Sequence, residues 1–358
     1  MRDFSARLAT ADEVADWDKL VQSNPNGGNV LQSAAYAEVK SHHGWNPIHV
    51  VLSCPEYTSY NLVIEKKVPL LGSLWYLIKG PDAAAAEDVP AMAQALGRFI
   101  KQTRRRVFAL KVEPDIVDSE EVRELFTSAG FVKTFNLQPN DSTALLDTTP
   151  DTEQILKNIS SRARNAVRRA IREGADVRRV DPTEENMRTM YRLMSHIEDR
   201  SDARMRSYEY YHRFWSNFVD AGQGRFYFAF DEDGEPNVGA FVIAYGKKGT
   251  YKDGGSKPRR NQYGDSHLVQ WTALTELKED FGIEEYDFCG TPPSSELKNK
   301  EHPHHGLGLF KTSFSKTVTD FTGCWDVVLD PLRYRMWNTI GERVTRQVYW
   351  RRHHQPFY

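Results

Sequence analysis

The chain has 358 residues, of which 40% are hydrophobic and 27% are charged, and its formal net charge is −2. This composition is ordinary for a folded protein, and the length favours two domains over one. Cys54, Cys289 and Cys324 lie too far apart for a zinc ribbon or a disulfide framework. No apolar run is long enough to span a membrane and no signal sequence is visible, so we expect a cytoplasmic protein.

The first part of the chain alternates helical and strand patterns. Apolar residues at helical spacing predict three helices, and runs rich in β-branched and aromatic residues predict four strands. A glycine at position 130 ends the last of these helices. In chain order the expected elements are a helix at 34–43, strands at 48–53, 60–68 and 74–79, a helix at 91–102, a strand at 107–112 and a helix at 119–129.

A strongly basic segment follows, with eight basic and only two acidic residues between 157 and 179. Apolar residues recur at helical spacing from 155 to 171, which predicts one amphipathic helix from 151 to 174. Like charges that repeat at i, i+4 repel one another, so this helix indicates an anionic partner such as a nucleic acid, a diphosphate or a phospholipid. A solvated face balanced by acidic residues elsewhere is the alternative. The arginines that share one face are Arg164, Arg168 and Arg172.

The second half of the chain repeats the order of the first. A helix is followed by three strands, a second helix and a strand, and this repeat predicts a duplicated α/β fold with mixed sheets. The expected elements are a helix at 208–221, strands at 225–230, 238–244 and 250–254, a helix at 266–281 and a strand at 285–289.

A basic loop follows the strand that contains Tyr251 and precedes a helix, which is a usual arrangement for binding phosphate. From Arg260 to Ser266 the loop matches the pyrophosphate turn of acetyl-CoA-dependent N-acetyltransferases only in part, with one glycine in place of two. The pattern therefore argues against a CoA site. A plain basic loop is the other interpretation.

Lys311 ends the segment Gly306-Leu-Gly-Leu-Phe-Lys311. The glycine-rich approach predicts a strand that holds Lys311 in an apolar setting, where an ammonium group stabilises an oxyanion or a phosphate. An ordinary strand-edge lysine is the alternative. Three histidines precede this segment without a carboxylate or cysteine at metal-ligand spacing, so no metal site is expected.

The segment from 333 to 358 interleaves aromatic residues with arginines and histidines. Such a mixture fits peripheral contact with an anionic membrane surface. It fits docking of the segment onto the first domain equally well, and both interpretations stay open.

Short motifs along nearly the whole chain resemble, in their order, those of the FemABX family of peptidoglycan bridge-forming aminoacyltransferases. The span from 187 to 214 has no room for the coiled-coil arm of some members, so the chain resembles the arm-less, FemX-like members. The motifs are Leu31 to Ser33 with Lys40 and Trp45, Lys111 to Asp115, Leu137 to Pro139 with Thr143, Ser161 to Gly174, Tyr251 to Ser256, Gln270 with Trp271, Tyr286 to Gly290, and Gly306 to Lys311 with Gly323.

The resemblance implies a fold of two GNAT-like (N-acetyltransferase-like) domains, one at 1–150 completed by 320–358 and one at 151–319. It implies transfer of Gly, Ala or Ser from aminoacyl-tRNA to the side-chain amine of the third stem-peptide residue of lipid II or UDP-MurNAc-pentapeptide. Aminoacyl-tRNA is then a co-substrate, and no cofactor is implied. The donated amino acid, the number added, the form of the precursor, the identity of the third stem residue and the oligomeric state stay open.

The resemblance also implies roles for single residues. Lys311 stabilises charge during transfer, Glu113 meets the acceptor amine, and Lys40 with Arg206 binds the diphosphate of the precursor. Two other functions stay open, an acetyl-CoA-dependent N-acetyltransferase and a non-catalytic accessory protein of the cell envelope. The basic helix serves as a path for tRNA phosphates or as a hinge between domains. Further substrate-binding positions are Tyr251, Ser256 and Tyr263, and the positions assigned to tRNA phosphates are Arg164, Arg168, Arg172, Arg259 and Arg260.

Overall fold

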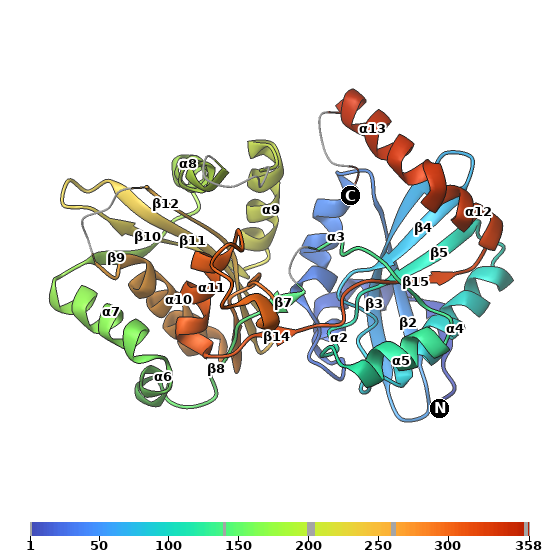
Figure 1. The fold of residues 1–358 in the computed structure, drawn as a ribbon, viewed down its shortest axis with the longest axis horizontal. Helices are drawn as coiled ribbons and strands as arrows, with labels where there is room; N and C mark the ends of the chain where they lie inside the picture. Colours follow the sequence, from blue (N-terminus) through green and yellow to red (C-terminus); the bar gives the residue numbers. More distant parts are fainter. Residues whose placement is uncertain (1, 139–140, 199–204, 259–262, 354–356, 358) are drawn as a thin grey trace. The chain divides into compact units, whose positions relative to one another are not determined.

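Two mixed β-sheets, one in each of two structural units, organise the chain (Figure 1). The first unit boundary lies at 141 instead of the expected 150, because the strands just after 141 pair within unit 2. Unit 1 comprises Met1–Asp141 and Phe321–Tyr358, and unit 2 comprises Ser142–Asp320. The structure, a computed structural model, describes residues 2–138, 141–198, 205–258, 263–353 and 357.

Seven strands form the mixed sheet in the described part of unit 1, in the order β1-β2-β3-β4-β5-β15-β6. Neighbouring strands are antiparallel except β4 and β5, which are parallel because helix α4 (Asp88–Gln102) crosses between them. The strands are β1 (Ser5–Leu8), β2 (Asn46–Ser53), β3 (Thr58–Val68), β4 (Gly72–Leu77), β5 (Val107–Val112), β6 (Val132–Lys133) and β15 (Trp325–Val328).

Helix α4 covers one face of this sheet through an apolar stripe. Val89, Met92 and Leu96 pack in one core with Trp75 and Leu110 of the sheet. Tight burial of such side chains contributes roughly 1.5–3 kcal/mol each relative to exposure. The other helices of unit 1 are α1 (Ala11–Ala15), α2 (Trp17–Gln22), α3 (Ala34–Ser41), α5 (Glu120–Ser128), α12 (Pro331–Met336) and α13 (Glu342–His353), with a 3₁₀ turn at Val30–Gln32 and a π turn at Trp337–Gly341.

Six strands form the mixed sheet in the described part of unit 2, in the order β8-β13-β12-β11-β10-β9. Again one pair is parallel, here β12 and β13, and α10 (Asp265–Phe281) crosses between them. The strands are β8 (Leu145–Asp147), β9 (Asp176–Val180), β10 (Gly224–Phe230), β11 (Pro236–Tyr245), β12 (Lys248–Ser256) and β13 (Glu285–Asp287), while β7 (Ser142–Thr143) pairs separately with β14 (Thr319–Asp320).

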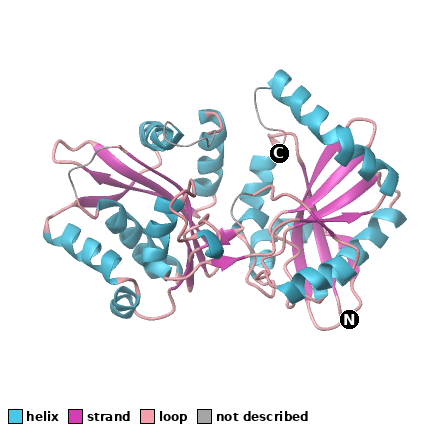
Figure 2. Cartoon of the chain, viewed as in Figure 1, coloured by secondary structure: helices cyan, strands magenta, loops and turns pink. Residues whose placement is uncertain are grey.

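Helices cover both faces of the unit 2 sheet (Figure 2). Because side chains of a strand alternate between faces, Tyr227 of β10 packs in the core with α7 and α10, whereas Phe226 packs against Trp215 of α9. The backbone of α8 lies so close to Gly255 of β12 that a Cβ there would overlap it. The helices are α6 (Thr152–Asn158), α7 (Ser161–Arg172), α8 (Glu184–Glu198), α9 (Tyr208–Asp220) and α11 (His305–Ser315), with a 3₁₀ turn at Ser294–Glu296.

The two sheets share one strand order, which confirms the predicted duplication. The series β1-β2-β3-β4-β5-β15 of unit 1 corresponds to the series β9-β10-β11-β12-β13-β8 of unit 2, with the single parallel pair at the same place. The sixth strand of each series lies outside the repeated segment, before it in unit 2 and after it in unit 1.

The basic helix predicted at 151–174 is two helices, so that prediction is wrong in one respect. Ile159 is extended, with ψ at 165°, and the Ser160 hydroxyl accepts a hydrogen bond from the Ala163 amide and caps α7. Ile155, Ile159 and Ala163 are all buried, so the apolar stripe runs on across the break. The region from 187 to 214 contributes to α8 and α9, without a coiled-coil arm among its described residues.

Candidate functional site

The parallel strands of unit 2 separate after a short contact. Within the described residues, β12 and β13 pair at three positions, the last being Thr250 with Asp287, and β12 then continues to Ser256. A bulge makes Lys252 an extra residue, because Val242 and Phe241 of β11 face Tyr251 and Asp253. Because of the bulge and the early end of β13, the two strands are paired only up to Thr250 and Asp287.

A tight turn after β13 orients two backbone carbonyl groups. Cys289 and Gly290 have φ values of 50° and 46°, a conformation that a side chain disfavours. The Asp287 carboxylate accepts hydrogen bonds from the Cys289 amide at 2.7 Å and from the Thr143 hydroxyl, which holds the turn in place. Both carbonyls then accept hydrogen bonds from Lys311, the one of Gly290 at 2.9 Å.

Lys311 lies on helix α11, so the predicted glycine-rich strand at 306–311 is wrong. Gly308 has a packing role, because a Cβ there would lie 2.7 Å from Pro292 Cδ. The Lys311 side chain is only 6% exposed, and its Nζ lies 5.7 Å from the ring centroid of Tyr251. The predicted apolar setting of Lys311 is therefore confirmed.

The surroundings make the Lys311 ammonium less basic than usual. Burial is the main cause that lowers its pKa to about 8, the influences of Cys289 and Asp287 oppose this, and Lys252 adds a smaller lowering. The described hydrogen bonds use two of the three ammonium N–H groups. At neutral pH the group therefore remains mostly charged and has one N–H group beyond those two hydrogen bonds.

Tyr251 and Lys252 line the same part of β12. Burial raises the pKa of the Tyr251 hydroxyl, so it acts as a neutral donor. Its hydroxyl occupies the space that a Cβ of Gly254 would take, so glycine is required there. Burial lowers the pKa of Lys252, but Asp253 at 3.5 Å and nearby tyrosines more than offset it, so the pKa lies above its ordinary value. Ser256 is half-buried at the end of β12.

Lys40 lies in unit 1, in the last turn of α3, and is 4% exposed. Its Nζ lies 5.4 Å from the ring of Tyr36 and 5.8 Å from the ring of Trp45. Lys66 of β3 approaches the same indole, with its Nζ 5.0 Å from the Trp45 centroid. Trp45 thus joins two buried lysines in one cationic cluster.

Glu113 follows β5 and is completely buried. Its carboxylate pairs with Lys79 Nζ at 3.2 Å and accepts a hydrogen bond from the Tyr76 hydroxyl. Asp115, which is partly exposed, lies 3.7 Å from the same ammonium. Glu113 is thus enclosed, whereas the Asp115 carboxylate is partly exposed.

The basic face of α7 is only partly free of internal contacts. Arg164 donates to the Lys157 carbonyl at 2.7 Å, where it closes the end of α6. Arg168 and Arg172 are exposed. The guanidinium of Arg169 lies 4.5 Å from the ring of Tyr263, which places Tyr263 on the α7 surface.

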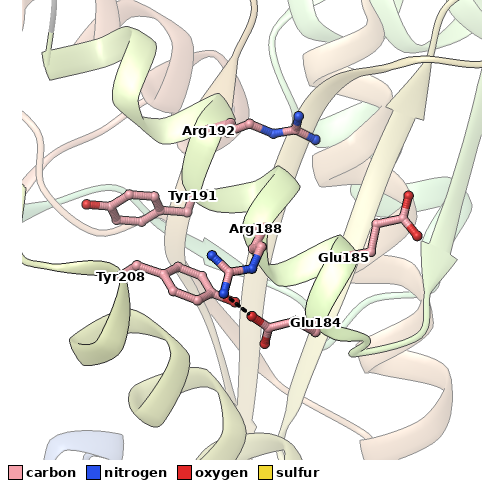
Figure 3. Close-up of a pocket in the computed structure, with 6 residues that line it drawn as sticks. All are labelled: Glu184, Glu185, Arg188, Tyr191, Arg192 and Tyr208. Carbon is pink, nitrogen blue, oxygen red and sulfur yellow. Dashed lines mark ion pairs between the residues drawn. The ribbon is translucent and has the colours of Figure 1, made fainter.

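A hollow of unit 2, about 740 Å³ in volume, lies between α8 and the start of α9 (Figure 3). Arg206 lies beside it, since its carbonyl accepts from the Tyr191 hydroxyl at 3.0 Å and its guanidinium covers Tyr210. Burial and the Glu184 carboxylate raise the pKa of Tyr208 to about 12. The hollow is lined by Glu184, Glu185, Arg188, Tyr191, Arg192 and Tyr208, of which Glu184 and Arg188 form an ion pair at 2.6 Å.

The structure brings only some predicted residues together. Lys311 and Tyr251 lie together in unit 2, Ser256 lies five residues further along β12, and Lys40 and Glu113 belong to unit 1. Arg259 and Arg260 lie outside the described residues. Among the residues that the structure does describe, no three His, Cys, Asp or Glu side chains gather as metal ligands.

The FemAB family model matches residues 10–230 and 227–342, which together span most of the chain. The chain belongs to the FemAB family. The lipid II:glycine glycyltransferase of Staphylococcus aureus strain MRSA252 is 22% identical over 408 aligned positions, covering 92% of this chain and 94% of that protein.

Solved structures agree with membership of the FemAB family. A crystal structure of FemX superimposes with a TM-score of 0.76 at 20% identity, covering 93% of this chain and 99% of that one. A conserved protein of unknown function from Bacteroides thetaiotaomicron superimposes with a TM-score of 0.55 at 10% identity, covering 91% and 99%. The fold is two GNAT-like domains, and the two duplicated sheets are their centres.

Within this FemAB fold, Lys252 and Asp287 are site residues to which sequence reasoning assigned no role. Asp287 had a usable signal, because an aspartate directly after a buried strand and before a glycine often fixes a turn. Lys252 had no usable signal, because the alternation of side chains along β12 does not reveal the bulge that makes Lys252 an extra residue.

Proposed function

We propose that this protein transfers Gly, Ala or Ser from aminoacyl-tRNA to the side-chain amine of the third stem-peptide residue of a peptidoglycan precursor. Membership of the FemAB family supports transfer of this kind. The name of the Staphylococcus aureus relative specifies lipid II and a glycyl group. Aminoacyl-tRNA is the second substrate in this proposal, and the reaction requires no further cofactor.

The proposed reaction is aminolysis of an ester. The acceptor amine attacks the ester carbonyl of the aminoacyl-tRNA and forms a tetrahedral intermediate with a negatively charged oxygen. Collapse of the intermediate breaks the bond to the terminal ribose oxygen and leaves an amide. The proton lost by the amine ends on that ribose hydroxyl, so charge and atoms balance.

The observation that carries the proposal is the position of Lys311. Its ammonium is held by two carbonyls of a fixed turn and retains one donor, so it is preorganised for a developing oxyanion. Tyr251 adds a hydroxyl with a raised pKa beside it. Because the ammonium remains protonated at neutral pH, it contributes charge stabilisation, and proton removal from the amine falls to other groups.

Unit 1 supplies the acceptor side in this proposal. Lys40 and its cationic cluster around Trp45 bind the precursor diphosphate. Glu113 holds Lys79 in place, and the carboxylate of Asp115 receives the acceptor amine. Arg206, which lies in unit 2, is assigned to the diphosphate by sequence position alone.

The donor side is assigned to the basic surface of unit 2. Arg168 and Arg172 of α7 are exposed and repeat at i, i+4, which suits contact with successive phosphates of tRNA. Arg164 has a structural role as well, through its hydrogen bond to the Lys157 carbonyl.

The decisive experiment mixes the purified protein with glycyl-, alanyl- or seryl-tRNA and either lipid II or UDP-MurNAc-pentapeptide. We expect a labelled aminoacyl product with at least one pairing, and none with acetyl-CoA in place of the charged tRNA. Acetylated product with acetyl-CoA, or no product with any charged tRNA, would reject the proposal.

Lys40→Met should raise the KM for the precursor at least tenfold, with an unchanged melting temperature. An unchanged KM would show that Lys40 does not bind the precursor diphosphate.

A further inference from the structure

A cavity of about 540 Å³ lies in unit 1 between α13 and the adjoining parts of β2 and β3. This volume is within the range of about 300–1,000 Å³ that is typical of small-molecule sites. Most of its wall is apolar or aromatic, formed by Trp45, Pro69, Val344, Val348 and Tyr349. The cavity is thus suited to a hydrophobic ligand.

One end of the cavity is positively charged. Lys66 is 3% exposed, and its Nζ lies 5.0 Å from the rings of Trp45 and Tyr349 and 4.8 Å from the ring of Phe357. The Glu65 carboxylate at the same wall accepts hydrogen bonds from Asn46 and from the Trp75 indole. The Lys66 ammonium therefore borders the apolar wall of the cavity.

Trp45 links this cavity to the residue assigned to the precursor diphosphate. The indole lies 5.8 Å from Lys40 Nζ and 5.0 Å from Lys66 Nζ. A diphosphate that contacts both Lys40 and Lys66 would lie at the Trp45 wall of the cavity, which Lys66 also lines. In a lipid-linked precursor the second substituent of the diphosphate is a polyprenyl chain, and in a nucleotide precursor it is uridine.

The helices beside the cavity also expose apolar and basic side chains to solvent. Val344 and Val348 of the cavity wall are 48% and 41% exposed, and Leu332 and Met336 of α12 are 70% and 53% exposed. Between 331 and 353 the chain has six arginines and one acidic residue, Glu342. Such a surface complements an anionic bilayer, from which a polyprenyl chain would enter.

We infer that the cavity receives the first isoprenyl units of a polyprenyl-diphosphate substrate, so that the acceptor is lipid-linked rather than nucleotide-linked. The inference rests on the proposed function for the identity of the substrate. It rests on three features, which are an aliphatic and aromatic wall, two lysines around Trp45, and exposed apolar side chains on α13 and α12.

The test measures binding directly, without tRNA or transfer. Calorimetry with the full chain compares farnesyl diphosphate, UDP and inorganic diphosphate. We expect farnesyl diphosphate to bind at least tenfold more tightly than either of the others. Equal affinity for farnesyl diphosphate and inorganic diphosphate, or tighter binding of UDP, would overturn the inference.

Substitutions assign the binding to the cavity. Val348→Asp should weaken farnesyl diphosphate binding about tenfold, because a carboxylate would replace part of the apolar wall and repel the ligand. Val344→Asp should weaken binding to a similar extent. It serves as the second variant if Val348→Asp lowers the melting temperature of the protein. Val14→Asp, at an exposed position of α1 outside the cavity lining, is the matched control and should stay within twofold. Equal losses in all three variants would count against the cavity.

Experiment can reject the proposed function and the lipid site independently of each other. Tight farnesyl diphosphate binding without any aminoacyl transfer would reject the proposed function and leave the lipid site intact. Transfer to UDP-MurNAc-pentapeptide and lipid II with equal KM, together with weak farnesyl diphosphate binding, would reject only the lipid site.

Discussion

Lys311 acquires its chemistry from the backbone that surrounds it. The described hydrogen bonds of its ammonium go to the carbonyls of Cys289 and Gly290 rather than to a carboxylate, so its charge is oriented without being neutralised. The Asp287 carboxylate accepts a hydrogen bond from the Cys289 amide and so fixes the turn that carries those carbonyls. The positive charge therefore stays available to a reacting oxygen.

Replacing Lys311 with methionine should lower kcat for aminoacyl transfer by about 10²–10³, the usual effect of removing one oxyanion donor. Methionine fills a similar volume, so the fold should persist. Steady-state kinetics with charged tRNA provide the measurement, and Lys298→Met at an exposed position is the matched control. A kcat within threefold of the unmodified protein would contradict the assigned role.

The lowered pKa of Lys311 has a predictable effect on stability. Between its folded pKa of about 8 and the ordinary value of 10.5, the unfolded chain binds more protons than the folded one. The stability of the unmodified protein relative to Lys311→Met should therefore rise as the pH increases through this window. Urea unfolding of both proteins at pH 7.5 and 9.5 tests this, and two parallel pH dependences would show that the ammonium is not desolvated.

At the scale of secondary structure, α7 combines a buried face with a basic one. Ala163, Ala166 and Val167 are buried, while Arg168 and Arg172 are exposed. The buried face anchors the helix against α10, where Gly264 permits contact with the Ala166 carbonyl. The exposed charges are therefore held by a rigid element.

Charge reversal of both exposed arginines should weaken tRNA binding at least tenfold and reduce its dependence on salt. The variant is Arg168→Glu with Arg172→Glu, and filter binding at several salt concentrations is the measurement. Arg213→Glu, an exposed arginine on α9, is the matched control and should change affinity less than twofold. Similar losses in variant and control would indicate nonspecific attraction instead.

The elements that sequence could predict are those whose pattern is set locally. The strand at 107–112 is buried at every position and almost entirely apolar, and it exists as expected. The edge strand β9 (Asp176–Val180) contains three charged residues and is mostly exposed, so only its pairing with β10 makes it a strand.

The errors near the site have tertiary causes. Two adjacent helices bury one continuous stripe at 155–170, so periodicity alone could not reveal the extended Ile159 between them. Gly306 and Gly308 suggested a strand. Position 308 instead requires glycine because Pro292 packs against α11 there and leaves no room for a side chain. The bulge at Lys252 follows from strand pairing with β11, which no local pattern encodes. Sequence thus singled out Lys311 but did not reveal how its ammonium is held.

At the scale of the whole molecule, both sheets are completed by a strand from outside their repeated segment. β15 lies between β5 and β6 in unit 1, and β8 lies at the edge beside β13 in unit 2. Trp325 of β15 is 3% exposed and contacts Phe126 at a centroid distance of 5.4 Å. The integrity of unit 1 therefore depends on residues far along the chain.

Substitution of Trp325 by alanine should destabilise unit 1 by roughly 3–5 kcal/mol, the usual cost of a buried tryptophan. Hydrogen exchange should show lost protection in β5 and β6, while β11 of unit 2 keeps its protection. Leu146→Ala is the corresponding substitution in β8 of unit 2 and should lower protection in unit 2 instead. Uniform loss over both units in either variant would show that they unfold as one.

The place of β15 also fixes the order in which a nascent chain can be completed. A ribosome releases all strands of the unit 2 sheet before it releases Trp325, so the unit synthesised first is finished last. In that interval β5 and β6 lack the strand that joins them and present open backbone hydrogen-bonding groups. A chain stalled before residue 325 is therefore exposed to mispairing and aggregation along β5 and β6 of its first sheet, even though its second sheet is complete.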